Sequence, residues 1–381
     1  MDGGPFWGCW NRLPFARRND ITSSWLRRED EQLPDRELCW QTVRRWLLLR
    51  ALGQRRHVRS AIPPESVRIL WLHQTDHLGD SLMRLSSVRL LQGRAVDLLA
   101  SAKAAALFEE GGVFRRIYCL DRDDAAAAGN PYDLVILDAL QTRPLMTKQR
   151  LFRATPFVSQ NDFFHFCRDD YNLTLFSWYR MAHLLGMALP ELEKQARLTM
   201  EYRSVPPDLL QKLEIREGAV GIALGGREAY RIYRAWDRVA DLLLREFPDL
   251  PLVLLGTENA GELAQRIVAA HPLARIVNCV ERLSLKESAA VIAGCRLLLC
   301  ADGGLLHVAN ATATPTVGLF AQEFPDLRYV PADRFRALRG EEDVNEINPE
   351  RVAREAGPAL AGEFEPWRVM AGPGGAQARW N

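Results

Sequence analysis

Two aspartates stand beside glycines at points where an apolar run of the sequence ends. Asp80 closes the stretch LGD after the run VRILWLHQ, and Asp302 opens the stretch DGG after RLLLC. A carboxylate at the end of a strand can accept the proton of a hydroxyl while that hydroxyl attacks. Glycines such as Gly303 and Gly304, at a turn from strand to helix, let backbone N–H groups approach a phosphate. The two segments therefore predict a general base and an anion site.

Each of these features also has a structural alternative. Asp80 could cap the helix that follows it, as aspartate often does. Gly303 and Gly304 could serve a turn that needs positive φ. His307, near the start of the helix after the glycines, could contact a ligand or pack in the core.

Metal-binding patterns are weak in this sequence. His73 and His77 are four residues apart, but they straddle the junction between a predicted strand and a turn rather than sharing a helix face. Asp121, Asp123 and Asp124 follow the run RRIYCL and precede an alanine run, which is typical of solvated charge in a loop. We therefore predict no metal site.

Cysteine usage and the apolar runs bear on the compartment. The seven cysteines are scattered without a C-x-x-C pair, which argues against a disulfide framework or a zinc site, and apolar surroundings favour buried free thiols. The first twenty residues hold no apolar core of a signal peptide, and no run of about 18 apolar residues predicts a membrane span. These features favour a reducing, cytoplasmic location.

Composition sets broad limits on the class of protein. The 381 residues are 48% hydrophobic and carry a net charge of +1, with 49 Lys and Arg against 48 Asp and Glu. Such a chain can bury two cores, and its charge gives no general case for binding nucleic acid. Any anion site must therefore be local.

The predicted elements alternate between short apolar strands and helices, which predicts parallel sheets. After a Trp- and Arg-rich extension over 1–65, the alternation runs through 66–204 and ends in an aromatic-rich helix around 160–190. A proline-bearing linker, VPPDLLQKLEIREG, precedes a second alternation over 205–345, for which we expect five strands. Residues 346–381 are expected to form a helix and a flexible tail. The prediction is an α/β protein with two doubly wound domains, whose ligands lie at the carboxyl ends of the strands.

Three motifs, taken in their order along the chain, resemble those of glycosyltransferase family 9, the ADP-heptose:lipopolysaccharide heptosyltransferases. The glycine-aspartate turn at 74–80 matches the family's first signature with Gln74 at the usual Arg, and Gly225-Gly226 with Arg234 and Asp237 is a degraded form of its Lys-bearing segment. The third and strongest match is carried by Ala301, Asp302, Gly303, Gly304, His307, Ala309, Ala311 and Pro315, of which Ala301 and Gly303 depart from the usual Asn and Ser/Thr.

The resemblance covers roughly residues 67–345 and implies the GT-B fold, with two Rossmann-like domains facing a central cleft. It implies that Asp80 is the catalytic base. It also implies that Asp302 contacts donor-sugar hydroxyls, that the Gly303–Gly304 backbone contacts the diphosphate, and that Arg234 stands where the family Lys neutralises phosphate. Glu258 would contact the ribose, and His307 would lie in the donor site.

The function expected from this resemblance is an inverting, metal-independent glycosyltransferase without a cofactor. Its donor is a nucleotide sugar, with ADP-heptose favoured, and its acceptor a hydroxyl of a lipopolysaccharide-type or other cell-surface glycan. Two alternatives stay open: a catalytically silent GT-B scaffold that binds sugar nucleotide or glycan, and a sugar-nucleotide epimerase. The acceptor-binding residues are unknown, and basic candidates for an anionic glycan are Arg143, Lys148, Arg150, Arg153 and Arg168.

The extension suggests one more partner. Residues 41–59 hold six arginines and no acid, together with Trp46 and several leucines. Such a segment could touch the anionic inner membrane surface peripherally. Alternatively, it is an amphipathic helix that packs its Trp/Leu stripe on the catalytic domain or between subunits.

Overall fold

The computed structural model describes residues 35–161, 172–188, 190–330 and 334–361. The chain divides into two compact units, Met1–Ala196 (unit 1) and Arg197–Asn381 (unit 2). Residues 1–34, Arg168 and the tail after residue 361 lie outside the described residues, so the interpretations placed on them are not addressed by the structure.

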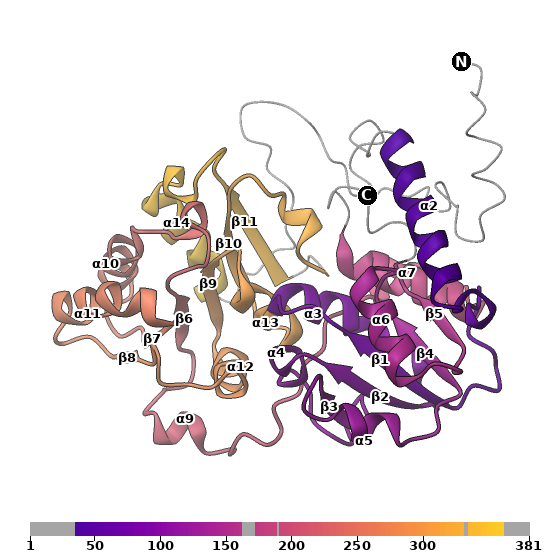
Figure 1. Cartoon of the computed structure of the whole chain (residues 1–381). Coiled ribbons are helices and arrows are strands. Elements are labelled where there is room, and N and C mark those ends of the chain that lie inside the picture. The colour runs from indigo at the N-terminus through magenta and orange to yellow at the C-terminus, as the bar shows by residue number, and fades with distance from the viewer. Residues whose placement is uncertain (1–34, 162–171, 189, 331–333, 362–381) are drawn as a thin grey trace. The chain divides into compact units, whose positions relative to one another are not determined.

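Unit 1 is built around a parallel sheet with the strand order β3-β2-β1-β4-β5 (Figure 1). The strands are β1 (Arg68–His73), β2 (Ala95–Ala100), β3 (Ile117–Cys119), β4 (Leu134–Leu137) and β5 (Phe157–Ser159). β1 is buried from Ile69 to His73 and β4 throughout, as expected for strands covered on both faces. The sequence prediction did not include β5.

The helical segments of unit 1 are mostly short. They are α2 (Asp35–Ala51), η1 (Arg55–His57), α3 (Leu78–Leu85), η2 (Ser86–Leu91), α4 (Ala102–Ala105), α5 (Asp124–Ala128), α6 (Thr142–Leu151), α7 (Leu173–Leu185) and α8 (Leu192–Gln195), where η marks a 3₁₀ turn. α7 ends at Gly186, whose φ of 65° is the left-handed conformation that commonly terminates a helix.

The extension is docked on unit 1 through α2. Leu49 of this helix is fully buried in a cluster with Leu70, Leu72 and Phe157, and α2 contacts α6. Trp40 and Leu47 remain 64% and 49% exposed. As the second of the two alternatives predicted, α2 packs on unit 1, and it does so through Leu49. Trp40 and Leu47 of the same helix remain exposed.

Unit 2 repeats the design with the strand order β11-β10-β9-β6-β7-β8, again parallel throughout (Figure 1). The strands are β6 (Val220–Ala223), β7 (Leu252–Leu255), β8 (Ile276–Asn278), β9 (Leu297–Ala301), β10 (Thr316–Phe320) and β11 (Phe335–Arg339). The expectation of five strands is wrong: the described residues form six. The sixth, β11, has the sequence FRALR and lies at the sheet edge, where its arginines need not be buried.

The helical segments of unit 2 cover this sheet. They are α9 (Leu209–Lys212), η4 (Ala229–Arg231), α10 (Trp236–Glu246), η5 (Glu258–Ala260), α11 (Gly261–Ala270), α12 (Leu285–Gly294), α13 (Gly304–Ala311), η6 (Pro325–Leu327), η8 (Val344–Glu346) and α14 (Pro349–Ala361). α10 and α14 pack together, and Trp236 and Tyr233 are fully buried between them and the sheet. Tyr233 also donates a hydrogen bond to the Ile347 carbonyl at 2.8 Å, which ties η8 to the core.

Candidate active site

Asp80 lies in the first turn of α3, directly beyond the carboxyl end of β1. It is half-buried, and among the described residues its carboxylate accepts no hydrogen bond and forms no ion pair. The N-cap position of α3 belongs to His77, whose side chain does not cap the helix. The helix-cap alternative for Asp80 is thus not what the structure shows, and the carboxylate is available to another group.

A buried hydrogen-bonded series lies beneath this turn. Nδ1 of His73 is 2.5 Å from Oδ2 of Asp138, and Nε2 of His73 is 2.9 Å from the Ser81 hydroxyl. The Trp71 indole N–H donates to the other Asp138 oxygen at 2.9 Å. His73, Asp138 and Ser81 thereby connect the end of β1, the end of β4 and the start of α3. The topological switch point of this sheet lies between β1 and β4, so His73 and Asp138 lie where such sheets commonly bind ligands.

The charge state of Asp138 follows from these contacts. Burial by itself disfavours the carboxylate, but His73, the positive charge of Arg84 and the Trp71 hydrogen bond outweigh it and hold the pKa of Asp138 below its ordinary value. Asp138 is therefore an anion that orients the His73 ring.

Ser81, His73 and Asp138 have the order of a Ser–His–Asp relay, yet Ser81 is 1% exposed and His73 is fully buried. A nucleophile must reach its substrate, and this hydroxyl cannot. Because Ser81 directly follows Asp80, its hydrogen bond instead fixes the helical turn that carries the Asp80 carboxylate. We interpret the series as a support for that turn.

In unit 2, the predicted site residues follow three neighbouring strands. Gly225 and Gly226 come after β6, Glu258 after β7 and Asp302 after β9. Because these strands are parallel, their carboxyl ends lie at one edge of the sheet. β6 and β9 flank the switch point of this sheet, where doubly wound proteins bind nucleotides.

Asp302 is buried at this edge, with 4% of the residue exposed. Nη1 of Arg231 lies 3.4 Å from its Oδ2, and Nη2 of the same arginine lies 3.8 Å from Glu323. The Arg231 guanidinium also lies over the Tyr230 ring at 5.1 Å. The sequence analysis did not include Arg231. The fold of the chain at η4 brings this side chain close to Asp302, and the spacing of the two residues along the sequence does not indicate the contact.

The glycines after β9 have ordinary backbone angles. Gly303 is extended, with φ 178°, and Gly304 begins α13 with negative φ. The alternative that they serve a positive-φ turn is therefore wrong. A β carbon at Gly303 would meet nothing closer than the Ala301 carbonyl at 3.8 Å, so the space beside this helix N-terminus is open.

Gly225 differs from them. Its φ is 81°, and a β carbon there would lie 2.5 Å from Oδ1 of Asn259. Nδ2 of Asn259 donates to the Gly226 carbonyl at 2.5 Å, which holds the glycine turn after β6 against η5. This turn requires glycine for both conformation and space.

The remaining predicted residues have varied surroundings. Arg234 is exposed, and its backbone N–H donates to Asn345 at 2.8 Å. Its guanidinium forms no ion pair in the described part of the chain, although its charge acts on Asp343. Glu258 is exposed, with no polar partner in that same part. His307 is buried on α13, 4% exposed. Over the described ranges, no group of three or more His, Cys, Asp or Glu could hold a metal ion.

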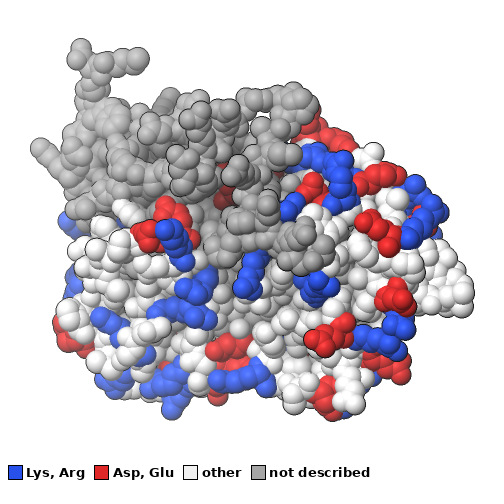
Figure 2. Space-filling view, turned by 180° about the vertical axis from the view of Figure 1, so that it is seen from behind, with Lys and Arg blue, Asp and Glu red and all other residues white. Residues whose placement is uncertain are grey.

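Surface charge and hydropathy give no further site on their own. Lys and Arg are mixed with Asp and Glu over much of the described surface seen in Figure 2. In the described portion of the chain, no helix is both long and apolar enough to cross a membrane.

Two parallel sheets with interleaved helices define a protein of the GT-B glycosyltransferase fold, as three solved structures bear out. The chain is similar to a glycosyltransferase family 9 protein from Veillonella parvula DSM 2008, with TM-score 0.66, 16% identity and coverage of 80% of this chain and 100% of that one. It is also similar to E. coli ADP-heptose lps heptosyltransferase II, with TM-score 0.61, 18% identity and coverage of 77% and 99%. E. coli heptosyltransferase WaaC with ADP gives TM-score 0.57, 15% identity and coverage of 78% and 99%.

A family model matches part of the sequence. Residues 170–343, less than half of the chain, match the model of glycosyltransferase family 9 (heptosyltransferase), in agreement with the resemblance carried by the motifs. No curated protein matches the chain. Over these residues the chain is similar to the glycosyltransferases of that family.

Proposed function

We propose that the chain transfers a sugar, heptose being favoured, from a nucleotide-sugar donor to a hydroxyl of a lipopolysaccharide-type or other cell-surface glycan. ADP-heptose is the first candidate donor, because two of the similar structures are named as heptosyltransferases and a further WaaC structure is titled as holding ADP-2-deoxy-2-fluoro heptose. The observation that carries the proposal is the Asp80 carboxylate in the first turn of α3, which has no hydrogen-bond or ion-pair partner among the described residues.

In the proposed reaction, Asp80 takes the proton of the acceptor hydroxyl while its oxygen bonds to the anomeric carbon. The bond from that carbon to the diphosphate breaks on the opposite face, so the configuration inverts. The leaving nucleoside diphosphate carries the electron pair and the negative charge away.

Unit 2 would stabilise that leaving group. Gly303 and Gly304 offer backbone N–H groups at the N-terminus of α13, where the helix dipole favours negative charge. Arg231 and Arg234 supply cations, and Asp302 and Glu258 would accept hydrogen bonds from hydroxyls of the sugar and the ribose. His307 would lie behind this site. With these groups no metal is required, so EDTA should leave the transfer rate unchanged.

A silent scaffold remains the second candidate, because Gln74, Ala301 and Asp237 depart from the family pattern. Gln74 is engaged within unit 1, where its side chain donates to the Thr147 hydroxyl at 2.9 Å. A scaffold would bind donor without releasing nucleoside diphosphate, and an epimerase would change the donor sugar without an acceptor.

The test is a panel of nucleotide sugars. A donor at 100 times its dissociation constant stabilises a protein by about 2.7 kcal/mol, which thermal unfolding detects. The stabilising donor is then incubated with acceptor glycans, and released nucleoside diphosphate and glycosylated product are measured together. Stabilisation without product would favour the scaffold, and no stabilisation by any member would remove the proposal.

The proposed setting is the cytoplasmic side of the membrane, with peripheral contact made by the extension. The support is local: exposed Trp40 and Leu47 share α2 with the exposed Arg44 and Arg50. No role for nucleic acid is proposed.

A further inference from the structure

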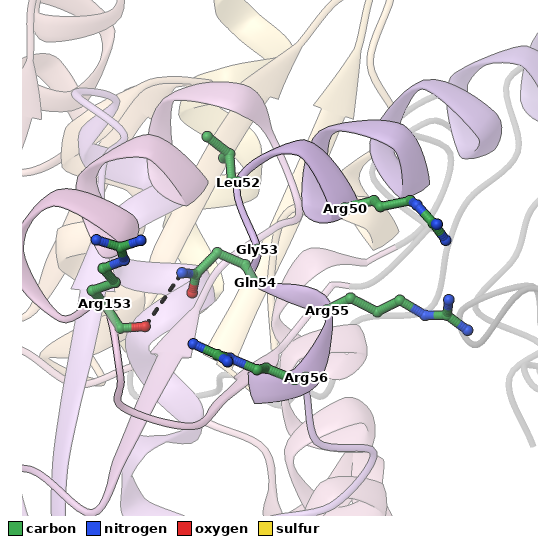
Figure 3. A pocket seen from close by; sticks show the side chains of 7 residues that line it. All are labelled: Arg50, Leu52, Gly53, Gln54, Arg55, Arg56 and Arg153. Carbon is green, nitrogen blue, oxygen red and sulfur yellow. Dashed lines mark hydrogen bonds between the residues drawn. The ribbon is translucent and has the colours of Figure 1, made fainter.

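A hollow of about 560 Å³ lies in unit 1, where α2 passes into η1. Its lining consists of four arginines and a short polar turn: Arg50, Leu52, Gly53, Gln54, Arg55, Arg56 and Arg153. Figure 3 shows Arg50 and Arg55 extending together to one side, with Arg56 and Arg153 on the other side of Gln54. We call this hollow the arginine pocket.

The four guanidinium groups have no acidic partner in the part of the chain that the structure describes. Over the described residues none forms an ion pair, and no acid lines the pocket. Arg50 and Arg55 lie 5.6 and 5.7 Å from the centre of the Trp46 ring, and Arg56 donates to Nε2 of His57 at 3.1 Å. These contacts orient the guanidiniums but supply no full negative charge. Other arginines of unit 1 do have aspartate partners, namely Arg68, Arg115, Arg122 and Arg150.

A buried cation lies under the same turn. Lys148 is fully buried, and its Nζ donates to Oε1 of Gln54 at 2.6 Å and to the Arg153 carbonyl at 3.4 Å. Burial lowers the pKa of Lys148 to about 8, so it remains largely charged at neutral pH. Burial, together with Lys148, Arg56 and Arg59, also lowers the pKa of His57. Burial alone causes the shift of Lys148, whereas the neighbouring cations add to the effect of burial at His57.

We propose that the arginine pocket binds a phosphate group, as a phosphomonoester or a diphosphate. Guanidiniums on two sides of one hollow match a ligand with several charged oxygens better than a single carboxylate, and arginine binds phosphate bidentately. A phosphomonoester carries between one and two negative charges at neutral pH. Bound there, it supplies the counter-charge that the four arginines and Lys148 lack.

The pocket is distinct from the donor site proposed for unit 2, because all its residues belong to unit 1. Arg153 is also one of the basic residues named above as candidates for an anionic acceptor. The phosphate could be carried by a lipid head group or by a soluble phosphate ester, and two probes separate these sources. The probes are inorganic pyrophosphate, and phosphatidylcholine vesicles with and without phosphatidic acid.

The experiment uses the full chain and two double variants, Arg50→Gln/Arg55→Gln and Arg56→Gln/Arg153→Gln. The matched control is Arg216→Gln/Arg296→Gln, which removes two exposed arginines of unit 2 that belong neither to the pocket nor to the proposed donor site. Pyrophosphate affinity is measured by calorimetry and vesicle binding by flotation. Thermal unfolding checks the fold of each variant. Because pyrophosphate and ADP both carry a diphosphate and can enter the donor site too, the difference between pocket variants and control reports on the pocket.

We expect each pocket variant to lose pyrophosphate affinity about tenfold or more, because charge-assisted hydrogen bonds disappear. The control should keep the parental pyrophosphate affinity. Loss of binding to phosphatidic acid vesicles in the same variants would assign a lipid head group, whereas loss of pyrophosphate binding alone would assign a soluble ester. Equal pyrophosphate affinity in pocket variants and control, or no binding of either probe by the parent chain, overturns the proposal. Failure of the transferase proposal would leave this result unaffected.

Discussion

Asp80 holds a carboxylate near the N-terminus of a helix without using it to cap that helix. The N-terminus of α3 carries a partial positive charge, and the absence of a partner in the described residues leaves the carboxylate lone pairs for a substrate proton. Both properties suit a general base. Its role can therefore be tested by a change that keeps shape and removes basicity.

Asp80→Asn should lower the transfer rate by about 10²–10⁴, since the amide cannot accept a proton. Donor affinity and thermal stability should stay at parental values, because no hydrogen bond of the described structure is lost. The matched control is Asp76→Asn, an exposed aspartate in the loop before α3. Steady-state kinetics and donor titration measure both effects. Transfer at near the parental rate by Asp80→Asn would remove Asp80 from the mechanism.

Arg231 gives a second prediction at the residue scale. Arg231→Gln should weaken ADP binding and lower the stability of unit 2 by about 1–3 kcal/mol, because buried Asp302 loses its cation. Arg234→Gln serves as the comparison: Arg234 is exposed, so its loss should weaken ADP binding with little change in stability. ADP titration and chemical denaturation distinguish the two. If Arg231→Gln binds ADP as the parent does, Arg231 has no part in the donor site.

At the scale of elements, two strands and a helix are joined by His73, Asp138 and Ser81. The Asp138 carboxylate lies 2.5 Å from Nδ1 of His73, and this contact holds the ring in the orientation in which Nε2 faces Ser81. An amide at position 138 can turn a donor toward His73 and disturb this order. His73, Asp138 and Ser81 are thus positioning residues for the turn that bears Asp80.

Asp138→Asn should therefore lower kcat while leaving the KM for the donor unchanged, since the proposed donor groups belong to unit 2. Ser81→Ala removes only the hydrogen bond between Ser81 and His73, and it should lower kcat by a smaller factor than Asp138→Asn does. A merely structural role would lower stability without separating kcat from KM. Should both variants keep the parental kcat, the series does not position Asp80.

The sequence predicted the strands of both sheets except β5 and β11. β6, β7, β9 and β10 are buried runs bounded by turns, and the residues after them follow from topology alone. β11 was missed because FRALR alternates apolar with charged residues at an edge. The alanine-rich stretch after Ser101 yields a helix of only four residues, Ala102–Ala105.

The residues of the candidate site also fall into two groups, those that the sequence predicted and those that it did not. Asp80 and Asp302 were found because a strand end lies beside them in the sequence. Arg231, His73 paired with Asp138, and the arginine pocket depend on contacts between distant segments, such as Lys148 with Gln54. The spacing of residues along the sequence does not show which residues from distant segments come into contact.

At the scale of the whole molecule, two units have separate cores, and the extension belongs to one of them. Leu49 enters the unit 1 cluster with Leu70 and Leu72, and Gln54 accepts from buried Lys148. Deleting residues 1–60 would therefore remove part of the unit 1 core along with the basic surface. A test of membrane contact by deletion would confuse the two effects, whereas point changes on α2 separate them.

Leu49→Ala should destabilise unit 1 by about 2–5 kcal/mol, because it leaves a cavity at a fully buried site. Leu47→Ala, on the same helix but 49% exposed, should change stability by about 0.5 kcal/mol or less. Hydrogen exchange read by mass spectrometry measures both units at once: protection should fall across β1, β4 and β5 in Leu49→Ala and stay unchanged in β6 to β10. Vesicle binding should follow the opposite pattern, weakened by Leu47→Ala if exposed α2 side chains enter the head groups and retained by folded Leu49→Ala. Equal loss of protection in the two variants would mean that α2 is not held on unit 1 by Leu49, and the helix would then be free to serve the membrane alone.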